Sequence, residues 1–121
     1  MVEWILHTEE FQKPWKINIV LISDDFITQI HEEYLSKKTP TDVLSFNLSE
    51  DFEDYFEGEI YISINRAQDQ ANTYNVSLKC ELYRLIAHGI LHLLGFDDKT
   101  EKQREIMKGH EDKILKKFAL L

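Results

Sequence analysis

The sequence predicts an α+β fold in one domain, because strand-like and helical segments mix without the regular alternation of a doubly wound sheet. Its 121 residues suffice for one domain with its own core. The apolar fraction of 43% is typical of a globular protein, and the single cysteine, Cys80, excludes an internal disulfide and suits the reducing cytoplasm. We therefore expect a single cytoplasmic domain over residues 1–121, with a small mixed sheet packed with helices.

Two helices and a strand are expected at the start of the chain. Apolar residues at helical spacing predict a short helix at residues 2–11. Residues 16–22, KINIVLI, are rich in β-branched side chains and predict a strand. The polar residues 23–25 then offer an N-cap for a second helix. The expected apolar face of this helix consists of Phe26, Ile27, Ile30 and Tyr34.

Two further strands are expected in the middle of the chain. One is predicted at residues 43–46 and the other at residues 58–63, where GEIYIS alternates apolar and polar side chains. The acidic and aromatic residues 49–57 between them are typical of an exposed loop. The pattern leaves the order of the strands in the sheet open.

The second half of the chain is predicted to be helical. Residues 65–75 indicate a helix with few apolar anchors, and residues 78–94 give the strongest helical pattern of the sequence. Thr100 and Gln103 form a capping box for a last helix that ends near residue 119. The expected buried stripe of the strongest helix consists of Leu82, Ile86, Ile90 and Leu93.

The formal net charge of −8 argues against general electrostatic binding to nucleic acid or to anionic membranes. No apolar run is long enough to span a bilayer, and the acidic N-terminal residues lack the basic region of a signal peptide. We expect no membrane partner and no DNA partner. A local basic groove, or a bound metal ion, is compatible with RNA binding despite this charge.

The most informative motif lies in and after the strongest predicted helix. His88 and His92 are four residues apart, so they share one helical face on which two imidazoles can chelate one ion. Gly95 can adopt the left-handed conformation that ends a helix and reverses the chain. Asp98 follows three residues later and can return its carboxylate to the ion. Neighbouring Asp97 competes for this role, although the spacing favours Asp98.

This spacing predicts a zinc-type metal site at the end of a central helix, with another divalent metal as the alternative. A histidine pair alone often lies on the surface or in the core without binding a metal. Here the turn glycine and the third donor favour a ligand role. Three protein ligands leave one coordination position open, as in catalytic zinc sites. Water bound to zinc is acidic enough to act as hydroxide near neutral pH, so we expect metal-bound water to be the catalytic group.

Other polar residues near the motif bear on the chemistry. Gly89 occupies the position at which the zinc-peptidase motif HExxH carries its general base, which argues against peptide hydrolysis by that mechanism. Glu81 and Arg84 fall near the line of His88 along the helix. They either belong to a solvated helix face or support the site and contact substrate. The remaining histidines, expected to be exposed, are His7, His31 and His110.

Three segments of the chain resemble the YbeY family, the bacterial endoribonucleases and rRNA maturation factors. HGILHLLGFDD at residues 88–98 is close to the family signature HGxLHLxGYDH. PTDVLSF at residues 40–46 and GEIYIS at residues 58–63 also match, and the order and spacing agree from about residue 18 to the C-terminus. Asp98 stands where the family usually has a third histidine.

The resemblance implies an α+β fold and one zinc ion per chain, held by His88, His92 and Asp98 in a shallow cleft. It further implies a zinc-dependent endoribonuclease that hydrolyses single-stranded RNA. The implied roles are maturation of the 16S rRNA 3′ end and ribosome quality control, with rRNA, the small ribosomal subunit and its proteins as partners. Aspartate binds zinc at about 2.0–2.2 Å, but its negative charge is expected to make the ion a weaker Lewis acid.

Basic residues that could contact phosphates differ from the family pattern. The family tends to carry a basic residue after the tyrosine that precedes the second segment, whereas Tyr34 is followed here by Leu35. Lys37 and Lys38 are candidate substitutes, and a solvated polar loop is the alternative for both. Arg84 is a third candidate for steadying a flanking phosphate.

Two other functions are compatible with the sequence. The first is a small-subunit assembly factor whose metal is structural or vestigial. Removing the metal would then unfold the protein or weaken its association, with no cleavage to lose. The second and less favoured function is a small zinc metallohydrolase acting on other substrates, such as peptides.

Overall fold

The computed structural model describes residues 1–35, 41–50 and 54–121. The elements in these ranges are α1 (Val2–Thr8), β1 (Trp15–Ile22), α2 (Asp24–Leu35), β2 (Val43–Asn47), β3 (Phe56–Ser63), α3 (Ile64–Tyr74), α4 (Leu78–Leu93) and α5 (Glu101–Lys117). The expected α+β class is confirmed. The strand expected from residue 58 begins earlier, at Phe56, which is buried rather than part of an exposed loop.

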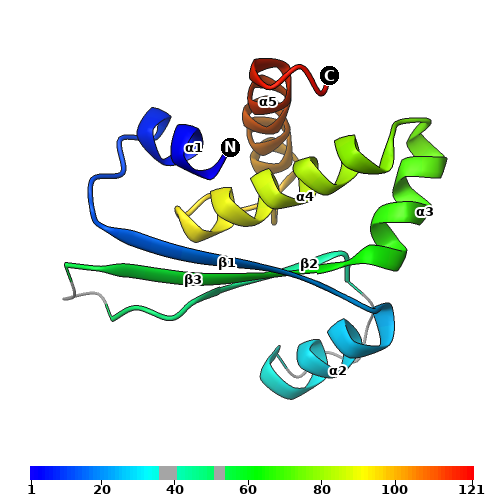
Figure 1. The fold of residues 1–121 in the computed structure, drawn as a ribbon, viewed down its shortest axis with the longest axis horizontal. Coiled ribbons are helices and arrows are strands. Elements are labelled where there is room, and N and C mark those ends of the chain that lie inside the picture. The colour runs from blue at the N-terminus through cyan, green and yellow to red at the C-terminus, as the bar shows by residue number, and fades with distance from the viewer. Residues whose placement is uncertain (36–40, 51–53) are drawn as a thin grey trace.

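Within the described residues, a three-stranded mixed sheet has the order β1-β3-β2. β1 runs parallel to β3 and places Ile19 beside Ile60, whereas β2 runs antiparallel to β3 and places Ser45 beside the same residue. The helices α1, α4 and α5 lie on one face of the sheet and α2 lies on the other (Figure 1). The last strand in sequence is therefore the central one.

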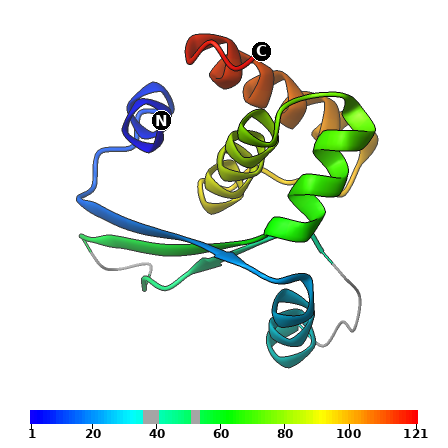
Figure 2. The same cartoon turned by 45° about the vertical axis from the view of Figure 1, so that its right-hand side comes forward.

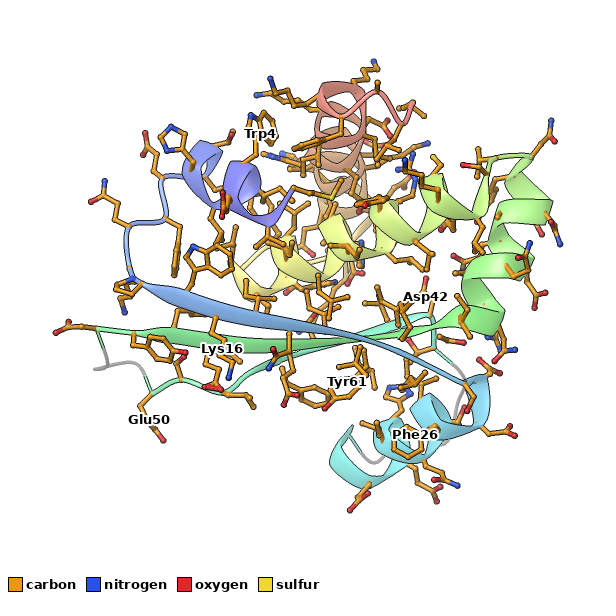
Figure 3. All side chains as sticks on the ribbon, viewed as in Figure 1. Trp4, Lys16, Phe26, Asp42, Glu50 and Tyr61 are labelled. Atoms are coloured by element: carbon orange, nitrogen blue, oxygen red, sulfur yellow. The ribbon has the colours of Figure 1, made fainter. Side chains whose placement is uncertain are left out.

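The two faces of β3 have different surroundings. Gly58 and Ile60 are buried against α4, where they lie beside Leu93 and Gly89 respectively. Tyr61, between buried neighbours, is only half-buried, and Figure 3 shows it on the face of the sheet away from α4. This alternation is the pattern that the sequence predicted for the strand, and it fixes which side of the sheet carries the core.

The helix α4 is the central helix of the fold. It packs against α1, α3, α5, β2 and β3, and Figure 2 shows it lying between the sheet and α5. Of the expected stripe, Ile90 is fully buried, whereas Leu82, Ile86 and Leu93 are only half-buried at the margin of the core. The prediction of one narrow stripe was wrong because neighbours cover α4 on several sides. Its fully or nearly fully buried apolar residues are Cys80, Leu85, Ala87, Gly89, Ile90 and Leu91.

The helix α2 buries only part of the face that was expected. Ile27 is fully buried, but Phe26 is half-exposed and projects from α2 below the sheet (Figure 3). His31 is only 9% exposed, which contradicts the expectation of an exposed histidine. Ile27 and His31 are four residues apart on one helical face, and α2 packs against β3 and α3, so this is the inward face.

The two other histidines outside the motif lie nearer the surface. His7 is exposed, as expected. His110 is half-buried, because its Nδ1 lies 3.2 Å from Glu9 Oε1 and its ring packs edge-on against Phe96. None of the helices in the described part of the chain combines the length and apolarity needed to cross a bilayer.

Gly89 marks the closest approach of α4 to the sheet. A Cβ atom at this position would lie 2.8 Å from Ile60 Cγ2 and 3.1 Å from Ser45 Oγ. The Ser45 hydroxyl also donates a hydrogen bond to the Gly89 carbonyl oxygen at 3.0 Å. The packing of α4 on β2 and β3 therefore requires glycine here.

We expect Gly89→Ala to lower the free energy of unfolding by about 1–3 kcal/mol, because the added methyl group forces α4 away from the sheet. Gly109→Ala in α5 is the matched control, since nothing lies within 4 Å of a Cβ atom built there. That control is expected to raise the free energy of unfolding by about 0.5–1 kcal/mol. Chemical denaturation measures both variants. A Gly89→Ala protein as stable as the wild type would contradict the close packing.

Candidate metal centre

The second half of α4 carries both histidines of the motif. The Ser77 hydroxyl caps the start of this helix by accepting a hydrogen bond from the Cys80 backbone N–H at 3.0 Å. His88 and His92 then lie one turn apart, with ring centroids 4.6 Å apart and ring planes at 77°. The helical spacing predicted from the sequence thus brings both rings to one face.

A glycine turn returns the chain to these histidines. Gly95 has a φ of 101°, in the left-handed region that L side chains rarely adopt. The Gly95 N–H donates to His92 O and the Phe96 N–H donates to Leu91 O, both at 3.0 Å. This hydrogen-bond pair is a Schellman motif, which ends α4 and redirects the chain toward Asp98.

The donor atoms of His88, His92 and Asp98 form a nearly equilateral triangle. The two Nε2 atoms are 3.1 Å apart, and Asp98 Oδ2 lies 3.3 Å from His92 Nε2 and 3.4 Å from His88 Nε2. Tetrahedral zinc with ligand bonds of about 2.0–2.1 Å requires neighbouring ligand atoms about 3.3–3.4 Å apart. Among the described ranges, this is the one group of three such side chains that could hold a metal ion.

The neighbouring carboxylate, Asp97, lies outside this triangle. Its Oδ1 accepts a hydrogen bond from the Asp98 backbone N–H at 3.1 Å, and its Oδ2 lies 3.9 Å from Lys99 Nζ. The Arg104 guanidinium also donates to the backbone oxygens of Asp98 and Lys99. These contacts hold the loop that presents Asp98, so the geometry favours Asp98 over Asp97 as a ligand.

Glu111 of α5 completes the surroundings of His88. Its Oε2 lies 2.7 Å from His88 Nδ1. Burial of the imidazole lowers the pKa of His88, but the hydrogen bond and negative charge of Glu111 outweigh this effect, so the pKa is raised above its ordinary value. With Nδ1 donating to Glu111, Nε2 keeps its lone pair free to bind a metal.

Sequence reasoning missed Glu111, although one signal was present. Glu111 shares the buried face of α5 with Met107, Ile114 and Leu115. A carboxylate on a core-facing position needs a partner, because burying a charge without one is costly. The helical pattern therefore indicated a buried polar contact, but not that the contact was to His88.

Arg84 connects the two helices behind the site. Its guanidinium lies 3.3 Å from Glu111 Oε1 and 3.1 Å from Asp112 Oδ1, and its side chain is 22% exposed. Glu111 thus has one oxygen facing Arg84 and the other facing His88. Arg84 was expected to lie on a solvated helix face, to support the site or to contact a phosphate. These contacts agree with the second of these roles, support of the site. Lys37 and Lys38, the other candidates for phosphate contacts, lie outside the described residues.

Glu81 is buried, so the alternative of a solvated helix face is wrong for this residue. It is 2% exposed, and its Oε2 has no hydrogen-bond partner among the residues that the structure describes. Burial raises the pKa of Glu81, and the negative charges of Asp42 and Glu111 act in the same direction against the lowering effect of Arg84. Glu81 precedes His88 by about two helical turns, or ~10 Å along the axis of α4. At this distance Glu81 is too far from His88 to bind the same metal ion.

The candidate metal centre lies between two hollows of the surface. One hollow, of about 450 Å³, is lined by residues 41–45 and 47 together with His88, His92 and Asp98. The other, of about 530 Å³, lies between α4 and α5 and is also lined by His88 and Asp98. His88 and Asp98 therefore line both hollows, whereas His92 lines only the first.

The chain matches the family model described as Endoribonuclease YbeY over residues 1–119. It belongs to the YbeY family. The resemblance drawn from three sequence segments is therefore confirmed, and the match also includes the N-terminal helix α1. The family assignment does not by itself test which residues bind metal, so the ligand set rests on the geometry described above.

Individual relatives agree with this assignment. The protein named Endoribonuclease YbeY from Cytophaga hutchinsonii is 39% identical over 100 residues, covering 83% of this chain and 69% of the relative. Its namesake from Bacillus subtilis is 36% identical over 130 residues, covering 99% of this chain and 83% of the relative. The solution structure of TM1509 from Thermotoga maritima has a TM-score of 0.62 at 29% identity, covering 98% and 79% of the two chains.

We expect Glu81→Met to raise the free energy of unfolding at pH 7 by about 1 kcal/mol, because it removes a buried acceptor without a partner. The raised pKa means that ionised Glu81 destabilises the fold at neutral pH. This cost disappears as the pH falls below 4.5, the ordinary value of the group, where the carboxyl is protonated in both states.

Denaturation at pH 7 and at pH 4 measures this effect. The difference in stability between Glu81→Met and the wild type is expected to shrink at the lower pH. Glu105→Met, on an exposed position of α5, is the matched control and is expected to show no such pH dependence. A Glu81→Met protein that is less stable than the wild type at pH 7 would contradict the assignment of Glu81 as a destabilising buried acid.

Proposed function

We propose that this chain is a zinc-dependent endoribonuclease that cleaves single-stranded RNA, with His88, His92 and Asp98 as the metal ligands. The triangle of donor atoms, with sides of 3.1, 3.3 and 3.4 Å, is the observation that supports this proposal best. The reaction is supported by relatives named Endoribonuclease YbeY that are 36–39% identical over most of this chain. Another divalent metal is the alternative to zinc.

The proposed biological setting is the maturation of rRNA, including the 3′ end of 16S rRNA, and ribosome quality control. The partners would be rRNA and the small ribosomal subunit with its proteins, in the cytoplasm. This part of the proposal rests on the family resemblance. Binding within a ribosomal particle would also reduce the electrostatic penalty that a net charge of −8 imposes on a free RNA-binding protein.

The residues of the proposed site have separate roles in binding the metal and in holding its ligands. Bound zinc would supply Lewis acidity toward a phosphoryl oxygen and toward water. His88 and His92 would bind it through Nε2, and Asp98 through Oδ2. Glu111 accepts the hydrogen bond from His88 Nδ1 and so orients the ring, while Arg84 holds the second oxygen of Glu111.

Asp42 is the candidate for positioning water and accepting its proton. It lines both the 450 Å³ hollow beside His88 and His92 and a smaller hollow near Glu81. Gln70 Nε2 donates to its Oδ2 at 3.2 Å, and Figure 3 shows Asp42 near α3, on the side of the sheet where α4 lies. Because Gly89 leaves the HExxH base position without a carboxylate, another group has to accept this proton, and Asp42 lies in the hollow that the three donor residues line.

Metal content tests the ligand set. We expect His88→Ala, His92→Ala and Asp98→Asn each to lower bound zinc to well below one ion per chain, because each removes one of three ligands. Asp97→Asn is the matched control and is expected to retain one ion. Elemental analysis of purified proteins measures the stoichiometry. Loss of zinc from Asp97→Asn with full occupancy in Asp98→Asn would assign the third ligand to Asp97 instead.

Cleavage of an end-labelled single-stranded RNA tests the activity. We expect zinc-loaded wild type to cleave it and His92→Ala, purified identically, to lose cleavage to background. His7→Ala is the control, because His7 is exposed and lies outside the motif. Equal cleavage by wild type and His92→Ala would indicate a contaminating nuclease. Full zinc occupancy without cleavage would favour the alternative function of a small-subunit assembly factor. Co-sedimentation of the protein with small ribosomal subunits would then test that alternative.

A further inference from the structure

The edge strand β1 is apolar but poorly buried. Its sequence, WKINIVLI, is apolar except for Lys16 and Asn18, yet none of its eight residues is buried. By contrast, the central strand β3 alternates between buried and half-buried residues. Trp15, Ile19 and Leu21 are 36%, 36% and 51% exposed, and they point to the same face of the sheet. Exposed apolar residues that line up along one strand indicate a surface that another molecule can cover.

The outer edge of β1 carries backbone groups that face away from the sheet. Within the described residues, β1 pairs with β3 on one side and with no strand on the other. Pro14 O accepts a hydrogen bond from the Phe56 N–H at 2.9 Å, so the even-numbered residues of this segment direct their backbone groups toward β3. The N–H and C=O groups of Ile17, Ile19 and Leu21 therefore point outward. Such a row of donors and acceptors is a template for pairing with another strand.

The charges around β1 permit two copies of the chain to approach along this edge. Residues 11–23 contain Lys13 and Lys16 but no acid, although the chain has 22 acidic residues. Edge strands are usually protected from such pairing by charged side chains, by proline or by a bulge. In β1 only Lys16, near the start, is charged, and Pro14 precedes the strand. The residues of β1 therefore add nothing to the repulsion between copies that a net charge of −8 causes elsewhere.

Charge complementarity favours an antiparallel arrangement of the two copies. Lys16 lies at the start of β1, and exposed Asp25 follows its end, whereas Asp24 is already paired with Arg66. In an antiparallel pair the basic start of one strand lies toward the acidic end of the other, whereas a parallel pair would place like charges side by side. The other edge strand, β2, is less suitable, because its residues line the hollow of about 450 Å³ at the candidate metal centre.

We propose that β1 pairs with β1 of a second copy of this chain, antiparallel and centred on Ile19, and so joins two sheets in one dimer. In this register the outward backbone groups of Ile19 bond to those of the partner's Ile19, and those of Ile17 bond to those of the partner's Leu21. The pairing is two-fold symmetric and therefore closes at two copies. Because β3 separates β1 from β2, the hollow at the candidate metal centre lies at the opposite edge of each sheet from the interface. The dimer does not depend on the proposed ribonuclease function.

Sedimentation equilibrium of the purified chain tests the proposal. One strand edge is a small interface, so we expect a dissociation constant on the order of 10 µM. The mean mass should rise from 14.4 kDa at about 1 µM toward twice that value at about 300 µM. A chain that stays monomeric across this range would overturn the proposal.

Three variants separate this edge from other apolar surface. Ile19→Lys would place like charges opposite each other at the centre of the interface, and we expect it to weaken dimerisation about tenfold or more. Phe26→Lys, at a residue of α2 that is 50% exposed, adds the same charge away from β1 and is the matched control that keeps the dimer. Ile19→Pro removes the outward N–H, a change that a free edge tolerates, and is also expected to be monomeric. Wild-type dimerisation of both Ile19 variants, or its loss in Phe26→Lys alone, would overturn the assignment to β1.

Amide hydrogen exchange followed by NMR locates the contact without any substitution. In the wild type, the amides of Ile17, Ile19 and Leu21 are expected to exchange several-fold more slowly at high protein concentration than at low concentration, because pairing in the dimer engages them. The amides of Asn18 and Val20 face β3, so they are the internal control and are expected to be protected at both concentrations. A mass that rises with concentration without this alternation would place the contact on another surface and overturn the proposal.

Discussion

The packing of α4 on the sheet at Gly89 is the constraint on which the rest of the site depends. With hydrogen as its side chain, Gly89 lets the helix backbone approach Ile60, and its carbonyl oxygen accepts a hydrogen bond from Ser45. His88 and His92 are thereby held beside β2, at the wall of a hollow. A glutamate at position 89 would place its Cβ 2.8 Å from Ile60, so the contact that seats the helix also excludes the general base of an HExxH site.

The polar side chains behind the metal centre differ in how well they are satisfied. Glu111 has a partner for each oxygen, Arg84 on one side and His88 on the other, and this chain of contacts ties α5 to α4. Glu81, on the same helix as Arg84, has no partner for its Oε2 within the described ranges. Natural proteins commonly violate such rules of polar satisfaction at functional sites and compensate for the cost elsewhere. Of these two buried acids, Glu111 therefore stabilises the site through its partners, whereas Glu81 is the acid whose burial is not compensated.

What the sequence could predict depended on how local each interaction is. The donor triangle was readable because His88 to Asp98 spans one helical turn and one glycine turn, whose geometry is set by nearby residues. Glu111 is 23 residues from His88, so no local pattern could pair them. The central position of β3 and the burial of His31 were hidden for the same reason, because the first depends on which strands pair and the second on how α2 packs against β3 and α3.

The proposed function requires an acidic chain to bind an anionic substrate. If Asp98 is a ligand in place of a histidine, a divalent ion there has a net charge of one rather than two, which weakens its attraction for phosphate. Arg104 and Lys108 line the adjoining hollow between α4 and α5, whereas the positive charge of Arg84 is already paired with Glu111 and Asp112. Exposed charges elsewhere on the surface are largely screened beyond about 8–10 Å at physiological salt. The net charge of −8 therefore opposes non-specific adhesion to RNA, while a phosphate at the proposed metal site would interact mainly with the ion and with the cations nearest to it.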